Sequence, residues 1–153
     1  MSTATHEPLN CDTEVLNDLL RGELSAVETY TQALGKFDDQ VLIVGLQKIR
    51  DDHSRAVREL RDHVIAFGKV PADSSGPWGA FTAAVTATAK AFGSATVLSA
   101  LRQGEEHGRN TYEDALENPD IRPDCHVTIR TSLLPACSRH VEELNQLLGG
   151  NHS

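Results

Sequence analysis

Apolar residues recur in alternating steps of three and four along four long stretches of the chain. In the first stretch, Leu16, Leu20, Val27, Tyr30 and Leu34 follow this spacing. Such spacing is typical of helices that bury one face inside a bundle. It predicts one helix from about Thr13 to Leu34, a second from Asp38-Asp39 to Gly68 and a third from Ser94 to about Ala115. A fourth helix follows a turn at Pro119 to Pro123, carries Ile129 to Leu147 and ends at Gly149-Gly150.

Each apolar series is interrupted once by a polar side chain: Glu23, His53, Glu105 and His140. A carboxylate that points into a bundle costs several kcal/mol unless it is paired or ligated. If the first hairpin turns near Asp38, Glu23 lies 15 residues before the turn and His53 lies 15 residues after it. We therefore expect these two residues at the same height. The expected heights of Glu105 and His140 agree less closely, because the second turn is longer.

The two halves of the chain resemble each other. Three pairs recur 82 residues later, namely Gly22-Glu23, Thr29-Tyr30 and Ala33-Leu34, as Gly104-Glu105, Thr111-Tyr112 and Ala115-Leu116. Three residues recur 87 residues later, namely Leu46, His53 and Leu60, as Leu133, His140 and Leu147. Internal repetition of this kind indicates two related helical hairpins, each with one glutamate and one histidine in its apolar seams.

The segment PADSSGP, from Pro71 to Pro77, is predicted to link the hairpins. Residues 77–92 are rich in alanine and threonine and predict an extra short helix, along or across the bundle. Pro135 lies inside the fourth helical pattern, so it should kink that helix or move its start. We expect a single all-α domain over 1–153, an antiparallel four-helix bundle, with flexible ends at 1–11 and 149–153.

The composition of the chain disfavours several classes of function. The chain has 14 Lys+Arg against 22 Asp+Glu and a net charge of −8, which disfavours binding to nucleic acid. No apolar run reaches the length of a membrane span, and the first residues lack the pattern of a secretory signal. The three cysteines show no CxxC spacing, which disfavours a disulfide framework. We expect a cytoplasmic protein, and a homo-oligomer such as a dimer.

Glutamate and histidine together suit iron, zinc or manganese. Helical bundles build metal sites from inward side chains on facing helices. Glu23, His53, Glu105 and His140 are therefore candidate metal ligands, sufficient for one four-coordinate ion. The alternative is a metal-free network in which each histidine pairs with the glutamate of its own hairpin.

Other polar residues near these four are expected to have structural roles. Tyr30 and Tyr112 stand seven residues beyond the glutamates and are expected to be core tyrosines, each with a hydrogen-bond partner. Asp51 and Asp52 are expected on a solvated face, and Cys137 in the packing.

These four residues and two tyrosines resemble the ferritin-like superfamily. LNDLL near the start, GEE before Tyr-x-x-Ala-Leu and a late histidine before a leucine-rich end look more closely like a bacterial two-hairpin branch. That branch is catalogued only as a domain of unknown function. The resemblance spans roughly residues 13–148; it implies a four-helix bundle and brings no established activity.

Two positions depart from the ferritin-like di-iron pattern, in which two helices carry Glu-x-x-His. The positions three before His53 and His140 hold Arg50 and Cys137 instead of carboxylates. A di-iron oxidase is therefore the least favoured interpretation, and we lean against an enzyme. The leading hypothesis is a small metal-binding or stress-related protein; the alternative is a metal-free interaction module.

Overall fold

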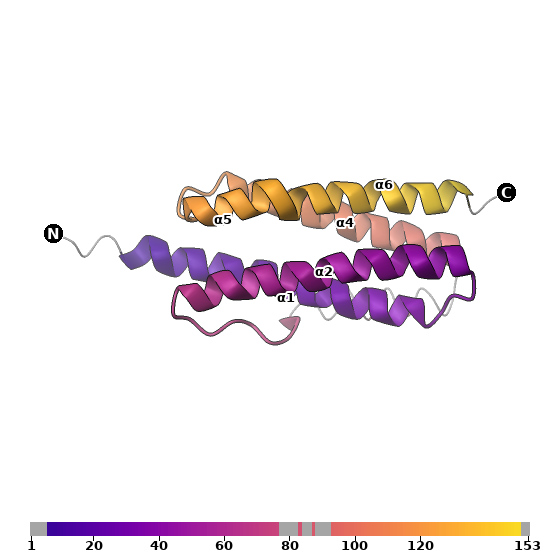
Figure 1. Ribbon diagram of the computed structural model, residues 1–153, viewed down its shortest axis with the longest axis horizontal. Helices are drawn as coiled ribbons and strands as arrows, with labels where there is room; N and C mark the ends of the chain where they lie inside the picture. Colours follow the sequence, from indigo (N-terminus) through magenta and orange to yellow (C-terminus); the bar gives the residue numbers. More distant parts are fainter. Residues whose placement is uncertain (1–5, 77–82, 84–86, 88–92, 151–153) are drawn as a thin grey trace.

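The computed structural model describes residues 6–76, 83, 87 and 93–150. The described elements are α1 (His6–Leu34), α2 (Gln40–Ala66), α4 (Ser94–Leu116), α5 (Pro123–Thr128), the π-helix η3 (Ile129–Leu133) and α6 (Leu134–Gly150), shown in Figure 1. The predicted all-α fold is confirmed, and the described residues include no strand. The predicted helix of residues 77–92 lies outside the described part of the chain, apart from single positions 83 and 87.

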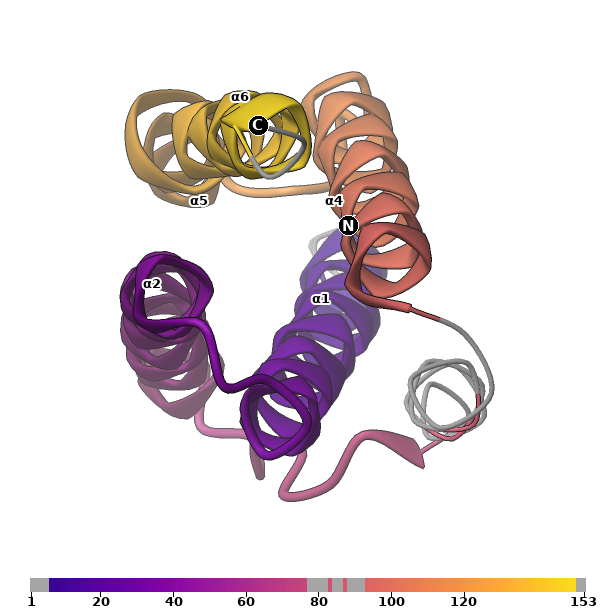
Figure 2. The ribbon, with the colours of Figure 1, turned by 90° about the vertical axis from the view of Figure 1, so that its right-hand side faces the viewer.

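The long helices form two antiparallel hairpins. α1 packs mainly against α2, and α4 packs mainly against α6. Viewed along the bundle, α1 also faces α4 and α2 also faces α6, so the four helices surround one central axis (Figure 2). The predicted antiparallel four-helix bundle is therefore present.

Helix ends follow the predicted signals in part. The Asp39 side chain accepts hydrogen bonds from the backbone N–H groups of Val41 at 2.8 Å and Leu42 at 3.4 Å, as a helix cap does. Gly68 follows α2 with φ +76°, a left-handed conformation that glycine adopts without strain. α1, however, begins at His6, so residues 6–11 belong to the helix, ahead of the predicted start near Thr13.

The buried side chains form two apolar clusters with a polar layer between them. One cluster gathers around Leu16, Leu60 and Ile129, and the other around Leu46, Leu98 and Leu144. Nine positions of α2 and its C-cap follow the apolar spacing, and eight of them are buried: Leu42, Leu46, Ile49, His53, Ala56, Val57, Leu60 and Val64. The ninth, Phe67, is partly buried. The apolar spacing therefore identified the buried face of α2 correctly.

The interruption expected at Pro135 is a π-helical turn just before it. The backbone N–H of Leu134 donates to the carbonyl of Ile129, five residues back. A proline in a regular α-helix lacks an N–H, and its ring clashes with the carbonyl four residues earlier. The wider turn brings the chain past Pro135 without ending the helix.

Among the described helices, none combines the length and the apolar character that crossing a membrane requires.

Candidate metal centre

The structure brings the four predicted residues together at mid-height of the bundle. Glu23 lies on α1, His53 on α2, Glu105 on α4 and His140 on α6. Their exposed fractions are between 1% and 6%. The long helices thus each contribute one polar side chain to a buried layer, as the apolar seams predicted.

His53 connects the two hairpins. Its Nδ1 lies 2.5 Å from Oε1 of Glu23, and its Nε2 lies 2.6 Å from Oε2 of Glu105. The expected contact between Glu23 and His53 at equal height is therefore present. The other oxygen of Glu105 lies 3.2 Å from Nδ1 of His140. Each histidine does contact the glutamate of its own hairpin, but Glu105 also accepts a partner from the other hairpin.

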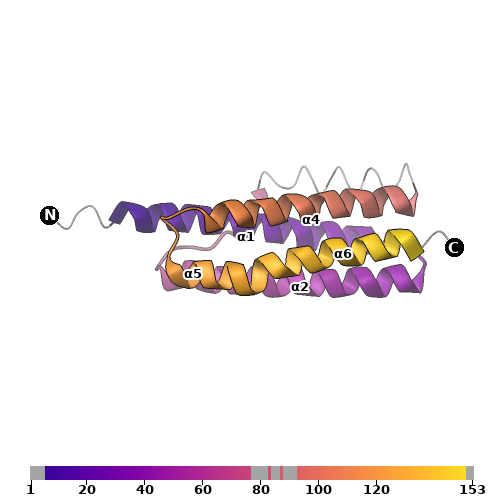
Figure 3. The ribbon, with the colours of Figure 1, turned by 90° about the horizontal axis from the view of Figure 1, so that it is seen from above.

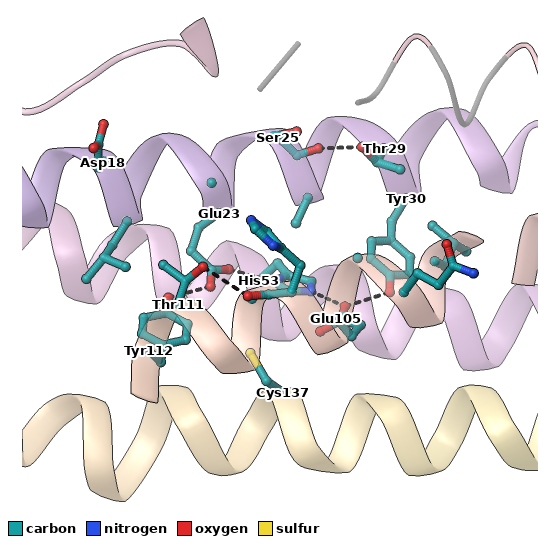
Figure 4. A pocket seen from close by; sticks show the side chains of 18 residues that line it. Asp18, Glu23, Ser25, Thr29, Tyr30, His53, Glu105, Thr111, Tyr112 and Cys137 are labelled. Atoms are coloured by element: carbon teal, nitrogen blue, oxygen red, sulfur yellow. Dashed lines mark hydrogen bonds and ion pairs between the residues drawn. The ribbon is translucent and has the colours of Figure 1, made fainter. Parts of the chain in front are cut away.

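Each of the two tyrosines donates a hydrogen bond to a glutamate in the other half of the repeat. Tyr30 on α1 donates to Glu105 on α4 at 2.6 Å, and Tyr112 on α4 donates to Glu23 on α1 at 2.5 Å (Figure 4). Both tyrosines are buried. They are the hydrogen-bonded core tyrosines that the sequence predicted, although each serves the glutamate of the opposite hairpin.

Asp52 belongs to the buried network, although nothing in the sequence indicated this. Its carboxylate was expected on a solvated face, yet its Oδ2 lies 2.9 Å from Nε2 of His140. Only 24% of its side chain is exposed. It also pairs with Arg55 at 3.0 Å on its outer side. Asp52 therefore closes the far end of the network, and the expectation of a solvated position was wrong.

The network holds opposite charges in contact. Burial alone lowers the pKa of His53, but the neighbouring carboxylates of Glu105 and Glu23 outweigh burial and raise that pKa well above its ordinary value. Burial alone raises the pKa of Glu105, but the charge of His53 and hydrogen bonds from both histidines bring it well below its ordinary value. His53 therefore carries a positive charge between two carboxylates.

The surrounding groups stay neutral. Burial, and after it the charge of a contacting glutamate, raises the pKa of Tyr30 and of Tyr112 well above the ordinary value. Burial and the charges of Glu23 and Glu105 raise the pKa of the Cys137 thiol. Both tyrosines thus act as hydrogen-bond donors at neutral pH, and Cys137 remains a thiol.

Tyr30→Phe and Tyr112→Phe should each lower the free energy of unfolding by about 1.5–3 kcal/mol, because each removes a hydrogen bond to a buried carboxylate. The two losses should be similar, since the tyrosines occupy equivalent positions of the repeat. Urea denaturation of both variants measures this. A loss within error of zero for both would show that the phenol groups do not stabilise the glutamates.

The donor set fits a transition-metal ion. His53, Glu105 and His140 each offer a ligand atom, and these atoms all lie within 4.8 Å of one another. Arg50, which stands where a carboxylate ligand would be in the di-iron pattern, pairs its guanidinium with Asp51 at 3.7 Å.

A cavity of about 330 Å³ adjoins the network between α1 and α4 (Figure 4). Much of its lining comes in pairs related by the internal repeat: Leu19 with Leu101, Gly22 with Gly104, Ala26 with Gly108, Thr29 with Thr111 and Tyr30 with Tyr112. Glu23, Glu105 and Cys137 line it as well. The carboxylates of the buried layer therefore border a space that can hold an ion or a small molecule.

The fold is that of a ferritin-like protein. A solved structure described as ferritin-like, diiron-carboxylate proteins from Bacillus anthracis str. Ames superposes with a TM-score of 0.75, covering 93% of this chain and 98% of that chain. The two sequences are 22% identical, so this likeness shows the fold alone.

No curated protein matches the sequence. A family described as "Domain of unknown function (DUF2383)" matches residues 12–118, which is more than half of the chain. The chain therefore belongs to the DUF2383 family, and its fold is that of the ferritin-like structure.

Proposed function

We propose that this protein binds one transition-metal ion between His53, Glu105 and His140. The observation that supports this is how each imidazole is held. One ring nitrogen of His53 and one of His140 face the same carboxylate, that of Glu105. Two imidazole nitrogens and a carboxylate are ligands that iron, manganese and zinc accept.

The opposite nitrogen of each ring lies against a second carboxylate. Nδ1 of His53 contacts Glu23, and Nε2 of His140 contacts Asp52. Histidines that bind metals generally donate their other N–H to a carboxylate, which fixes the tautomer and orients the ring. We therefore assign Glu23 to the orientation of His53, whereas the sequence analysis counted it among four ligands. Asp52 has the same role for His140.

The charges favour a cation. Glu23, Glu105 and Asp52 contribute three carboxylates around two imidazoles. A bound ion would take the place of the proton that His53 now holds between its Nε2 and Glu105, so the carboxylates keep a positive partner in both states. Such an ion would supply Lewis-acid or redox chemistry beside the cavity between α1 and α4.

Purification without chelator or nickel, followed by elemental analysis, tests the proposal. We expect about one equivalent of metal, or its uptake when the metal-free protein is titrated with Mn(II) or anaerobic Fe(II). His140→Ala should abolish it, whereas Asp52→Asn should weaken the affinity roughly 10–100-fold because the ligands remain. His126→Ala is the matched control, since His126 lies on α5 and its ring contacts the carbonyl of Asn118. Equal Mn(II) affinity in wild type and His140→Ala would contradict the assignment.

A second candidate is a metal-free module in which the network fixes helix register. It is favoured by the closed hydrogen bonding of His53, whose two nitrogens both have carboxylate partners. In that case neither Mn(II) nor Fe(II) would bind or raise the melting temperature.

Oxygen consumption after addition of Fe(II) separates simple metal binding from oxidase chemistry. We expect no oxygen consumption, because Arg50 and Cys137 replace two carboxylates of the di-iron pattern.

A further inference from the structure

A second group of metal-binding side chains lies where α2 ends beside α5 (Figure 3). His63, Asp124 and Cys125 each offer one ligand atom, and these atoms lie within 4.8 Å of one another. The group shares no residue with the network at mid-height. We propose that these three residues form a separate zinc site, joining the first hairpin to the second.

The hydrogen bonds around His63 determine which nitrogen is available. The hydroxyl of Thr128 donates to the carbonyl of Asp124 at 3.3 Å. Its oxygen lies 3.0 Å from Nε2 of His63 and, with its own hydrogen used, accepts from that nitrogen. Nε2 therefore carries the proton, and Nδ1 presents a lone pair. Thr128 orients His63 as an outer hydrogen-bond partner orients a metal ligand.

The lone pair of His63 faces a sulfur at the spacing that zinc requires. Nδ1 of His63 lies 3.5 Å from Sγ of Cys125. A tetrahedral zinc ion with bonds of about 2.3 Å to sulfur and about 2.05 Å to nitrogen separates those two atoms by about 3.6 Å. The ion could therefore enter with little movement of either side chain.

The combination of ligands favours zinc. A thiolate with an imidazole favours zinc among the common divalent ions, and the thiolate and the Asp124 carboxylate together carry the two negative charges that balance Zn²⁺. Binding would release the thiol proton of Cys125 to solvent as the zinc–sulfur bond forms. Asp124 is exposed and Cys125 is buried, so the group reaches from the core to the surface, where water could supply a fourth ligand.

Titration of the full chain with Co(II), a spectroscopic substitute for zinc, tests the site. We expect a thiolate-to-cobalt charge-transfer band that zinc abolishes. Cys125→Ser and His63→Gln should remove the band. The other cysteines are the matched controls, so Cys11→Ser and Cys137→Ser should keep it. Chelator competition should show a zinc affinity at least about tenfold weaker in Asp124→Asn and unchanged in His126→Gln, whose ring contacts the Asn118 carbonyl instead.

A wild-type protein without the band, or a band that persists in Cys125→Ser, would overturn the proposal. If Cys125→Ser fails to fold because this residue is in the core, His63→Gln and Asp124→Asn decide, since both positions reach the surface. The result is independent of the central site. Suppose that His140→Ala abolishes Mn(II) uptake but the wild-type protein shows no cobalt–thiolate band. That result would refute the zinc site and leave the central site supported.

Discussion

His53→Ala should lower the free energy of unfolding of the metal-free protein by about 3–5 kcal/mol. The imidazole contacts Glu23 at 2.5 Å and Glu105 at 2.6 Å, and both carboxylates are at least nine-tenths buried. Its removal leaves two buried negative charges without their shared positive partner. The midpoint of urea denaturation, with the slope unchanged, measures the loss.

The control for this experiment is Gln47→Ala, which truncates an exposed side chain on the same helix, α2. Substitutions at exposed positions generally change stability by no more than about 0.5 kcal/mol. A His53→Ala midpoint as close to wild type as that of Gln47→Ala would mean that the carboxylates do not depend on His53. Both the metal-bound and the metal-free interpretation of the buried layer would then be wrong.

The sequence predicted the fold well because the residues on the buried face of a helix recur every three to four positions. A step of three or four residues returns to the same side of a helix, so the seam of α2 from Leu42 to Val64 could be identified residue by residue. The start of α1 was harder to predict from the sequence. Residues 6–11 have no strong apolar repeat, and the helix continues through them from His6.

The approach of Glu23 to His53 was predictable because two positions equally far from a tight turn lie at one height. Asp52 was not predictable in the same way. It is rotated by about 100° from His53 on the helix, and that side of α2 faces α6. The order of the helices around the bundle decides whether such a position meets water or a neighbour, and the spacing of apolar residues carries no information on that order.

The cluster of His63, Asp124 and Cys125 illustrates the same limit over a longer distance in sequence. His63 is adjacent to Val64, which occupies the seam, and the other two residues follow a turn more than 50 positions later. Their approach depends on where the second turn places α5 against the end of α2. The only sequence signal was the presence of histidine, aspartate and cysteine near predicted helix ends.

Cys137→Glu should lower the stability of the metal-free protein by about 3–5 kcal/mol, because it buries another carboxylate without a partner. Cys137 is 3% exposed and lines the same cavity as Glu23 and Glu105. Burial, and after it the charges of Glu23 and Glu105, raises the pKa of the thiol, so the position already disfavours a negative charge. The substitution restores Glu-x-x-His before His140, the spacing of ferritin-like di-iron sites.

Mn(II) or anaerobic Fe(II) should recover this loss if the central layer binds metal, because the new carboxylate would gain a cation. Thermal denaturation with and without the ion measures the recovery. Cys137→Gln separates charge from size: it introduces the same volume beside the cavity without the charge, so it should lose less stability and gain less from the ion. Equal stability of the two variants in the metal-free state would show that the layer does not resist negative charge. A Cys137→Glu protein that remains destabilised with saturating Mn(II) and Fe(II) would favour the metal-free network, in which His53 balances the charges of Glu23 and Glu105.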